Sequence, residues 1–242
     1  MAHSGTDLPA APLRVSLFVT CLADSLFPRT GEATVRVLER LGCEVAFPRE
    51  QTCCGQMHRN TGYDREASIL AERWQRVFAD ADAIVSPSAS CVVTLRETLG
   101  DEIPLYELTE FLTDRLGVED VGAHYPRRVA YHPTCHSIRV LGVGDRATRL
   151  LRAVRGLDLV KIPREQECCG FGGTFAVKNP AVSEAMGSDK LAAVESTGAE
   201  VITALDDSCL MHLGGMLDRR RSPTQTVHIA EILGTIEGAE GP

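Results

Sequence analysis

Short apolar runs alternate with longer amphipathic stretches along the first half of this chain. Apolar residues dominate positions 15–20, 44–47 and 83–86, as they do in short buried strands. Between these runs, residues 30–41 and 67–78 carry apolar side chains at helical spacing. Strands and helices in alternation are typical of an α/β fold with an open parallel sheet.

The second half of the chain repeats this order. Strand-like runs occur at 129–131, 159–162 and 201–204, and a helical stretch lies around residues 150–154. The octapeptide PREQTCCG, which begins at Pro48, returns as PREQECCG about 115 residues later. A repeat of this length is far longer than the units of solenoid proteins, so it predicts two fused homologous lobes.

We therefore expect an α/β protein of two pseudo-symmetric lobes, each a small open parallel sheet flanked by helices. The predicted organisation is a flexible N-terminus at residues 1–12, a first lobe at 13–120, a second lobe at 121–236 and a loose tail at 237–242. The segments PLYELTEFL and TVHIAEIL also match between the lobes. Their match pairs His228 with Tyr106 or Glu107 and predicts a structural role for this histidine.

Composition and charge limit the classes of function. The chain has 25 Lys and Arg against 33 Asp and Glu, a net charge of -8, which argues against nucleic acid as a partner. No stretch offers the roughly 20 apolar residues of a membrane span, and the N-terminal segment MAHSGTDLPAAP lacks the pattern of a signal peptide. We expect a cytoplasmic protein.

The nine cysteines are many for a cytosolic chain, and an odd number cannot pair completely within one molecule. Eight of them form two matching series, Cys21, Cys53, Cys54 and Cys91 in the first lobe and Cys135, Cys168, Cys169 and Cys209 in the second. The ninth, Cys43, aligns with Asp158 and is expected to be a core residue. Cysteine can also serve as an inert apolar residue, but that role predicts scattered positions. The repeated spacing instead favours metal binding or redox chemistry.

Each repeated cysteine follows the carboxyl end of a predicted strand. In open α/β sheets ligands bind at this edge, because the loops there form a crevice and helix N-termini point into it. The three predicted strand ends of each lobe therefore bring four thiols to one place.

Several chemistries fit four such thiols. A structural zinc site usually has paired C-x₂₋₄-C ligands, whereas here two cysteines are adjacent and their side chains diverge. An iron–sulfur cluster needs thiolates and gains from nearby backbone N–H groups, and Gly55 and Gly170 would let the backbone approach such a cluster. Iron–sulfur is the leading interpretation, while zinc, thiol–disulfide exchange and an inert core remain alternatives.

Three histidines lie close to the cysteines in sequence. His132 and His136 flank Cys135, and His58 follows the first CCG, so each is a candidate metal ligand or catalytic proton acceptor, or only a hydrogen-bonding residue of the loop. The GFGG segment at 170–173 lacks the third glycine of a dinucleotide fingerprint, with Phe175 in that place. We expect neither flavin nor NAD on this chain.

The pattern Cys…Cys-Cys-Gly…Cys in two copies resembles the cysteine-rich CCG domain family. That family includes the cysteine-rich subunit of heterodisulfide reductase and the iron–sulfur subunits of glycolate oxidase and anaerobic glycerol-3-phosphate dehydrogenase. The segments CCGQ and CCGFGGTFAVK are most similar to the short stand-alone members of this family that take part in lactate utilisation. The similarity extends from about Arg14 to Ile236.

The resemblance implies an iron–sulfur subunit with a [4Fe–4S] cluster in each lobe, held by the eight repeated cysteines. It implies a ferredoxin-type iron–sulfur subunit and a third small subunit as partners, and a small 2-hydroxy acid, L-lactate, as the substrate oxidised to pyruvate. A zinc-binding structural or scaffold subunit, or a thiol–disulfide reductase subunit of the heterodisulfide reductase type, is the alternative.

The chain departs from the family at one position in each lobe. The fuller family motif ends in CxxC and supplies five thiols per lobe, whereas Ser88 and Asp206 replace the first cysteine of that pair here. Four thiols can hold an ordinary [4Fe–4S] cluster. An oxygen ligand from Ser88 or Asp206, or a cluster with one open iron, is a further alternative.

Overall fold

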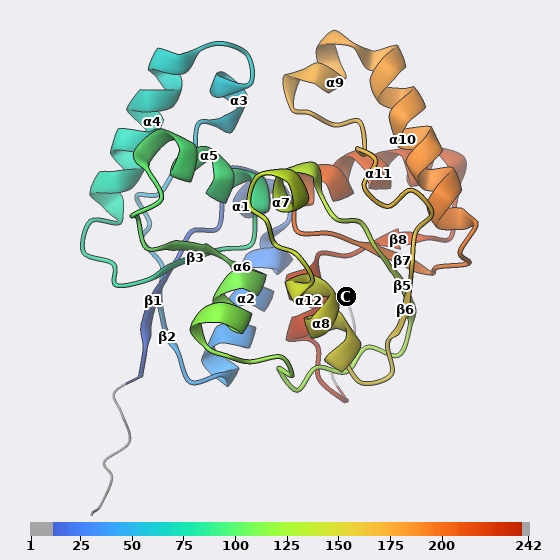
Figure 1. Cartoon of the computed structure of the whole chain (residues 1–242), viewed down its shortest axis with the longest axis horizontal. Helices are drawn as coiled ribbons and strands as arrows, with labels where there is room; N and C mark the ends of the chain where they lie inside the picture. The colour runs from blue at the N-terminus through green and yellow to red at the C-terminus, as the bar shows by residue number, and fades with distance from the viewer. Residues whose placement is uncertain (1–11, 239–242) are drawn as a thin grey trace, which may run out of the picture.

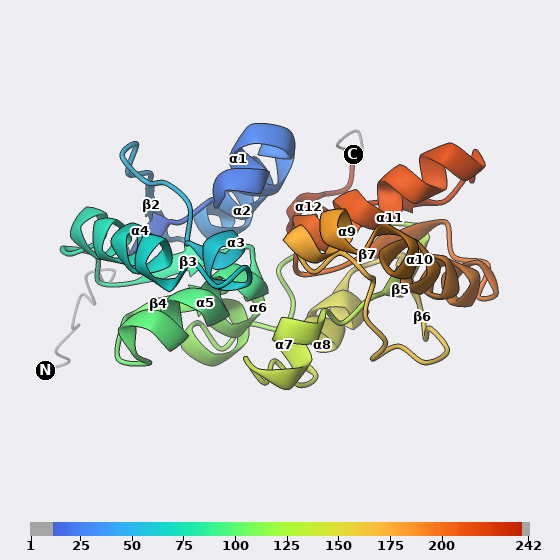
Figure 2. The ribbon, with the colours of Figure 1, turned by 90° about the horizontal axis from the view of Figure 1, so that it is seen from above.

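The computed structural model describes residues 12–238, which form two α/β lobes lying side by side (Figures 1 and 2). The first lobe has a parallel sheet in the order β2-β1-β3-β4. Its strands are β1 (Arg14–Leu17), β2 (Glu44–Ala46), β3 (Ile84–Ser86) and β4 (Leu105–Glu107). Its helices are α1 (Cys21–Leu26), α2 (Pro28–Arg40), α3 (Gln56–Arg59), α4 (Asp64–Val77), α5 (Ala89–Leu99), α6 (Leu108–Glu110) and the π-helix η1 (Phe111–Arg115).

The second lobe has the same topology, with a parallel sheet in the order β6-β5-β7-β8. Its strands are β5 (Arg128–Tyr131), β6 (Asp158–Val160), β7 (Val201–Thr203) and β8 (Gln225–Thr226). Its helices are α7 (Cys135–Arg139), α8 (Arg146–Ala153), α9 (Thr174–Lys178), α10 (Pro180–Glu195), α11 (Asp207–Arg220) and α12 (Ile229–Gly234). The prediction of two pseudo-symmetric lobes with parallel sheets is confirmed.

The strand register corrects one detail of the repeat alignment. Arg14 pairs with Glu44 in the first sheet, and Arg128 pairs with Asp158 in the second. Glu44 is therefore the counterpart of Asp158, and the pairing of Cys43 with Asp158 was wrong by one residue. The cause is the loop between the second strand of each sheet and the CCG, which is one residue longer in the second lobe.

The fourth strand of each sheet was not predicted, and it leads into a short capped helix. Glu107 ends β4 and accepts hydrogen bonds from the backbone N–H groups of Thr109 and Glu110. His228 occupies the same position before α12, where its Nδ1 accepts a hydrogen bond from the N–H of Ala230 at 3.1 Å. His228 is therefore a helix cap, as its predicted structural role requires, and Glu107 is its counterpart.

A shared hydrophobic core joins the lobes. The largest apolar cluster combines side chains of both sheets and of the helices between them, including Leu38 and Val129. Helices α2 and α12 pack against each other near the centre of Figure 1. Their backbones lie so close that a Cβ at Gly234 would be 3.1 Å from the Cβ of Ala33. Cys43 is buried in this cluster, as expected of a core residue.

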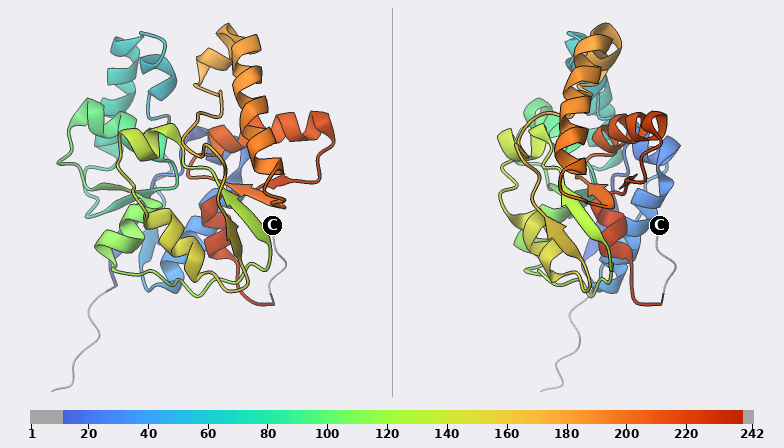
Figure 3. Two further views of the ribbon diagram at one scale, coloured as in Figure 1. Left: turned by 45° about the vertical axis from the view of Figure 1, so that its right-hand side comes forward. Right: turned by 90° about the vertical axis from the view of Figure 1, so that its right-hand side faces the viewer.

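The helix pairs that follow the two CCG segments project from the same side of the molecule. These pairs are α3 with α4 and α9 with α10 (Figure 3). No helix within residues 12–238 is both long enough and apolar enough to cross a membrane. The predicted flexible N-terminus at 1–12 and loose tail at 237–242 lie almost entirely outside the described residues.

Candidate metal centres

Three loops at the carboxyl edge of each sheet carry the repeated cysteines, as the sequence predicted. In the first lobe, Cys21 begins α1 just after β1, and Cys53 and Cys54 lie in the loop after β2. Cys91 lies in the first turn of α5, after β3. The second lobe places Cys135, Cys168, Cys169 and Cys209 at the corresponding positions of β5, β6 and β7. In both lobes the cysteines thus lie in the loops that follow short strands or in the first turn of the next helix.

In the first lobe the four thiols form two close pairs. The Sγ atoms of Cys21 and Cys53 are 3.7 Å apart, and those of Cys54 and Cys91 are 3.2 Å apart. Hydrogen bonds from the Cys21 and Cys54 thiols lower the pKa of Cys53 to about 2. The backbone N–H of Gly55 also donates to the Cys53 sulfur, at 3.4 Å. The pKa of Cys53 therefore lies below the pKa values of its partners Cys21 and Cys54, which are both raised.

The second lobe repeats this arrangement. The Sγ atoms of Cys135 and Cys168 are 3.5 Å apart, and the N–H of Gly170 donates to the Cys168 sulfur at 3.3 Å. Hydrogen bonds from the Cys135 and Cys169 thiols lower the pKa of Cys168 to about 2. Hydrogen bonds with Cys168 and Cys209, together with burial, raise the pKa of Cys169. One thiolate per lobe is thus stabilised at the same position of the repeat.

These distances suit metal coordination. All nine cysteines are free thiols, and the paired sulfurs are much farther apart than the roughly 2.05 Å of a disulfide. A metal with sulfur bonds of about 2.3 Å holds two tetrahedral thiolates about 3.8 Å apart, close to the 3.7 Å between Cys21 and Cys53 and the 3.5 Å between Cys135 and Cys168. Soft thiolate ligands select zinc, copper(I) or iron–sulfur clusters. The donor set therefore fits an iron–sulfur cluster and also fits zinc.

Gly55 and Gly170 follow the adjacent cysteines in a left-handed conformation, with φ of +90° and +93°. A Cβ at Gly55 would lie 3.1 Å from the carbonyl oxygen of Ala67 in α4. A Cβ at Gly170 would overlap the carbonyl oxygen of Ser183 in α10. The glycines are thus required by the close approach of the CCG loop to a helix, while their N–H groups face a cysteine sulfur.

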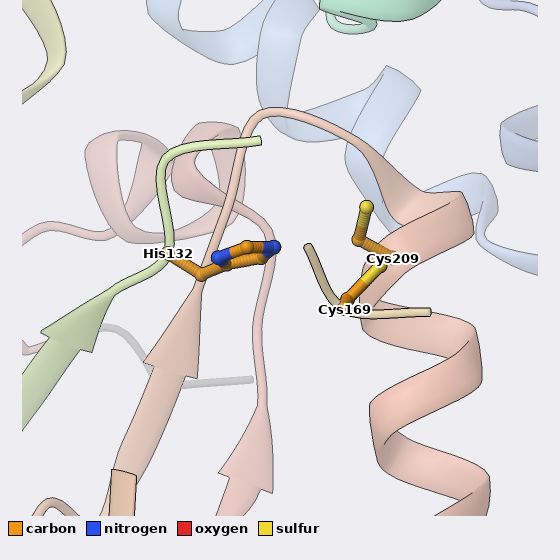
Figure 4. A group of neighbouring side chains, drawn as sticks. All are labelled: His132, Cys169 and Cys209. Carbon is orange, nitrogen blue, oxygen red and sulfur yellow. The ribbon is translucent and has the colours of Figure 1, made fainter. Parts of the chain in front are cut away.

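Of the three candidate histidines, His132 alone joins a group of potential ligands. One of its ring nitrogens and the sulfurs of Cys169 and Cys209 provide three ligand atoms within 4.8 Å of one another (Figure 4). Burial lowers the pKa of His132 to about 3, so the imidazole is neutral. His136 and His58 are half-buried, in α7 and α3 respectively, and join no such group among the described residues.

Ser88 and Asp206 form a hydrogen-bonded link between the lobes. They are the N-cap residues of α5 and α11, and the Ser88 hydroxyl donates to Asp206 Oδ1 at 2.9 Å. The backbone N–H of Ser90 donates to the same oxygen at 3.0 Å, and the Thr134 hydroxyl donates to Oδ2 at 2.6 Å. Both carboxylate oxygens are therefore engaged within the protein. This arrangement favours a positioning role for Asp206 over that of an oxygen ligand.

The two CCG loops are anchored by different side chains, which the sequence did not reveal. In the first lobe, the Gln51 amide donates to the carbonyls of Leu17 and Pro48. In the second lobe, Lys190 is almost completely buried, and its Nζ donates to the carbonyls of Arg164 and Glu165 at 3.3 and 3.0 Å.

Comparisons with known proteins identify the family of this sequence. The sequence matches the family described as "CCG: Cysteine-rich domain" over residues 15–96 and 129–214. It is 46% identical to the Lactate utilization protein A of Geobacillus kaustophilus, covering 91% of this chain and 98% of that protein. It is 44% identical to the protein of the same name from Bacillus subtilis, covering 91% and 99%.

Solved structures give only a weak likeness. An aspartate racemase homologue from Pyrococcus horikoshii is 12% identical in sequence and matches with a TM-score of 0.37, covering 91% of this chain and 95% of that protein. This likeness is too small to bear on function.

Proposed function

Because this chain belongs to the cysteine-rich CCG domain family, and within it to the group of lactate utilization protein A, we propose that it is the iron–sulfur subunit of a complex that oxidises L-lactate to pyruvate. The observation that carries this proposal is the duplicated set of four cysteines at the carboxyl edge of each sheet. Two equivalent thiolate sites in one chain suit a protein that passes electrons between two centres.

In this proposal the eight repeated cysteines hold one cluster per lobe, a [4Fe–4S] cluster by resemblance to the family. When bound, such clusters accept and release single electrons. The chain's own residues hold and shield the site. The N–H groups of Gly55 and Gly170 donate to ligand sulfurs, which offsets the negative charge of the thiolates. Cys54 and Cys169 are buried, which keeps water from the inner side of each site.

Oxidation of a 2-hydroxy acid removes two electrons and two protons, so the proposed complex needs more than electron-transfer centres. We assign the remaining chemistry to its other subunits, a ferredoxin-type iron–sulfur protein and a third small protein. The half-buried residues His58 and His136 remain candidate proton acceptors on this chain. The proposal places no flavin or NAD on it.

Zinc is the second candidate. The close grouping of His132, Cys169 and Cys209 matches a ligand combination common in zinc proteins. A zinc-binding chain would be a structural or scaffold subunit without an electron-transfer role. Iron, acid-labile sulfide and zinc analysis of protein purified without oxygen distinguishes the two, because iron–sulfur clusters contain sulfide and absorb visible light whereas zinc sites do neither.

Metal content provides the first test. Replacing Cys53 and Cys54 together with serine should remove about half of the iron after anaerobic reconstitution, because the second lobe keeps a complete ligand set. The C168S/C169S double variant should likewise lose about half of the iron, in this case the iron of the second lobe. Cys43→Ala is the matched control: it removes a buried cysteine outside both sets, so the iron content should not change, at a stability cost of about 1 kcal/mol. Full retention of iron in both double variants would disprove the ligand assignment.

Activity provides the second test. The isolated chain should not reduce a dye with lactate as the electron donor, because in this proposal the acceptor for the Cα hydrogen belongs to another subunit. Activity should appear when the partner subunits are added, and it should be lost again with the Cys169→Ser variant. Sustained turnover by the isolated, metal-free chain would contradict this division of labour.

A further inference from the structure

The two candidate centres differ in the residues that lie behind their cysteines. Cys21 and Cys135 are equivalent, so Phe18 and His132, each three residues earlier, occupy the same position of the repeat. Phe18 and His132 follow the first strand of their sheets, and both are completely buried. The second lobe thus has an imidazole where the first has a phenyl ring.

A second exchange accompanies the first. The contact of Gly55 with Ala67 corresponds to that of Gly170 with Ser183. Seven residues farther along these helices, α4 carries Trp74 and α10 carries Lys190, and both side chains are buried. Because the two helices are equivalent, an aromatic residue in one lobe is again replaced by a nitrogen base in the other.

In the first lobe the aromatic pair makes an apolar wall. The rings of Phe18 and Trp74 are in edge-to-face contact, with centroids 5.8 Å apart. They belong to one apolar cluster with Cys54 and Cys91. A phenyl ring has no ligand atom, and the indole N–H of Trp74 can only donate a hydrogen bond. The candidate metal ligands of the first lobe are therefore its four cysteine sulfurs.

In the second lobe the imidazole faces the sulfurs. His132 lies with Cys169 and Cys209 in the group of ligand atoms within 4.8 Å, and Figure 4 shows its ring directed towards these two cysteines. Neither ring nitrogen has a hydrogen-bond partner in the described part of the chain. A buried polar atom without a partner is unfavourable, and coordination to a metal would satisfy one of the two nitrogens.

We propose that the second-lobe centre is a mixed nitrogen–sulfur site in which His132 ligates the metal beside Cys169 and Cys209 and takes the place of one of the other two cysteines of that lobe, whereas the first-lobe centre has sulfur ligands only. The metal site itself rests on the proposed function. A neutral imidazole adds no negative charge, and the buried Lys190 donates to the loop that leads to Cys168. Imidazole ligation raises the reduction potential of iron–sulfur centres, so the second-lobe centre has the higher potential of the two.

The C53S/C54S double variant isolates the second-lobe site for the test. It is loaded in one sample with zinc and in another with iron and sulfide, so that ligation is measured whichever metal the site prefers. X-ray absorption at each metal edge detects imidazole scattering, and pulsed electron paramagnetic resonance of the reduced iron sample detects a directly bound nitrogen. We expect both signals.

Two substitutions in this background assign the nitrogen. His132→Phe introduces the residue of the first lobe and should remove the nitrogen signals, whereas His136→Phe, which changes a neighbouring histidine, should leave them intact. Zinc affinity should fall at least about tenfold in the His132→Ala variant. Added imidazole should restore it, a result that a purely structural role of His132 does not give and that also shows the variant to be folded.

The outcomes separate this inference from the proposed function. Sulfur-only coordination of both zinc and iron in the second lobe would overturn the inference, even if iron and sulfide are bound as proposed. Failure to bind iron and sulfide, with a nitrogen ligand on zinc, would overturn the proposed function and leave the assignment of His132 in place.

Discussion

Replacing Asp206 with alanine is expected to lower the free energy of unfolding by roughly 3–5 kcal/mol, because several hydrogen bonds to one buried carboxylate are lost together. Its oxygens accept hydrogen bonds from the Ser88 hydroxyl, the Ser90 N–H and the Thr134 hydroxyl. Without the carboxylate these three buried donors lose their shared acceptor. The same change should weaken metal binding in both lobes, because Ser88 also accepts a hydrogen bond from the N–H of Cys91.

Chemical denaturation and the metal content of the variant measure the two effects. Asp207 is the matched control, since it is the next residue, is also buried, and has one side-chain hydrogen bond, from Thr30 at 3.1 Å. Burial raises its pKa from 3.8 to about 6. Its protonated form therefore stabilises the fold at low pH, and this contribution is lost as the pH rises through 6.

Asp207→Asn should consequently gain stability relative to the unaltered chain as the pH is raised from 4 to 7, and it should keep its metal. A loss of metal from only the second lobe in the Asp206→Ala variant would show that this carboxylate does not couple the two sites.

The cysteine repeat made the lobes and their strand-end sites predictable, because both depend on local pattern. The positions of Cys21 and Cys135 follow from an apolar run that ends at a cysteine, and the octapeptide fixes the second loop of each lobe. The strands β4 and β8 escaped prediction because their sequences, LYE and QT, contain polar residues and do not form the continuous apolar run that marks β3 and β7. Their existence follows from pairing with β3 and β7, which is a long-range property.

The polar partners of the sites were not predictable for the same reason. Asp206 appeared in the sequence only as a replacement for a family cysteine, while its partners Ser88 and Thr134 lie 118 and 72 residues away. The equivalence of Trp74 and Lys190 could not be predicted either, because it depends on which face of α4 and of α10 contacts the CCG loop. That face became clear only from the contacts of the neighbouring glycines with α4 and α10.

Gly170→Ala is expected to destabilise the chain by roughly 3 kcal/mol or more and to remove the metal of the second lobe. A left-handed conformation costs an alanine about 1–2 kcal/mol, and Gly170 has a φ of +93°. The new Cβ would also overlap the carbonyl oxygen of Ser183, a backbone atom of α10 that cannot rotate away. The Ser183 hydroxyl donates to the carbonyl of Gly170 at 2.8 Å and holds the two segments together.

Two matched glycines separate the conformational cost from the overlap. Gly62 has a φ of +87° and would place its Cβ in open space, so Gly62→Ala should show the conformational cost alone, about 1–2 kcal/mol. Gly55→Ala should have an intermediate effect, since its Cβ would be 3.1 Å from the carbonyl oxygen of Ala67. Urea unfolding gives the order of stability, and iron or zinc content gives the loss of each site. If Gly170→Ala were no more damaging than Gly62→Ala, the close approach of the CCG loop to α10 would not determine the geometry of the second-lobe ligands.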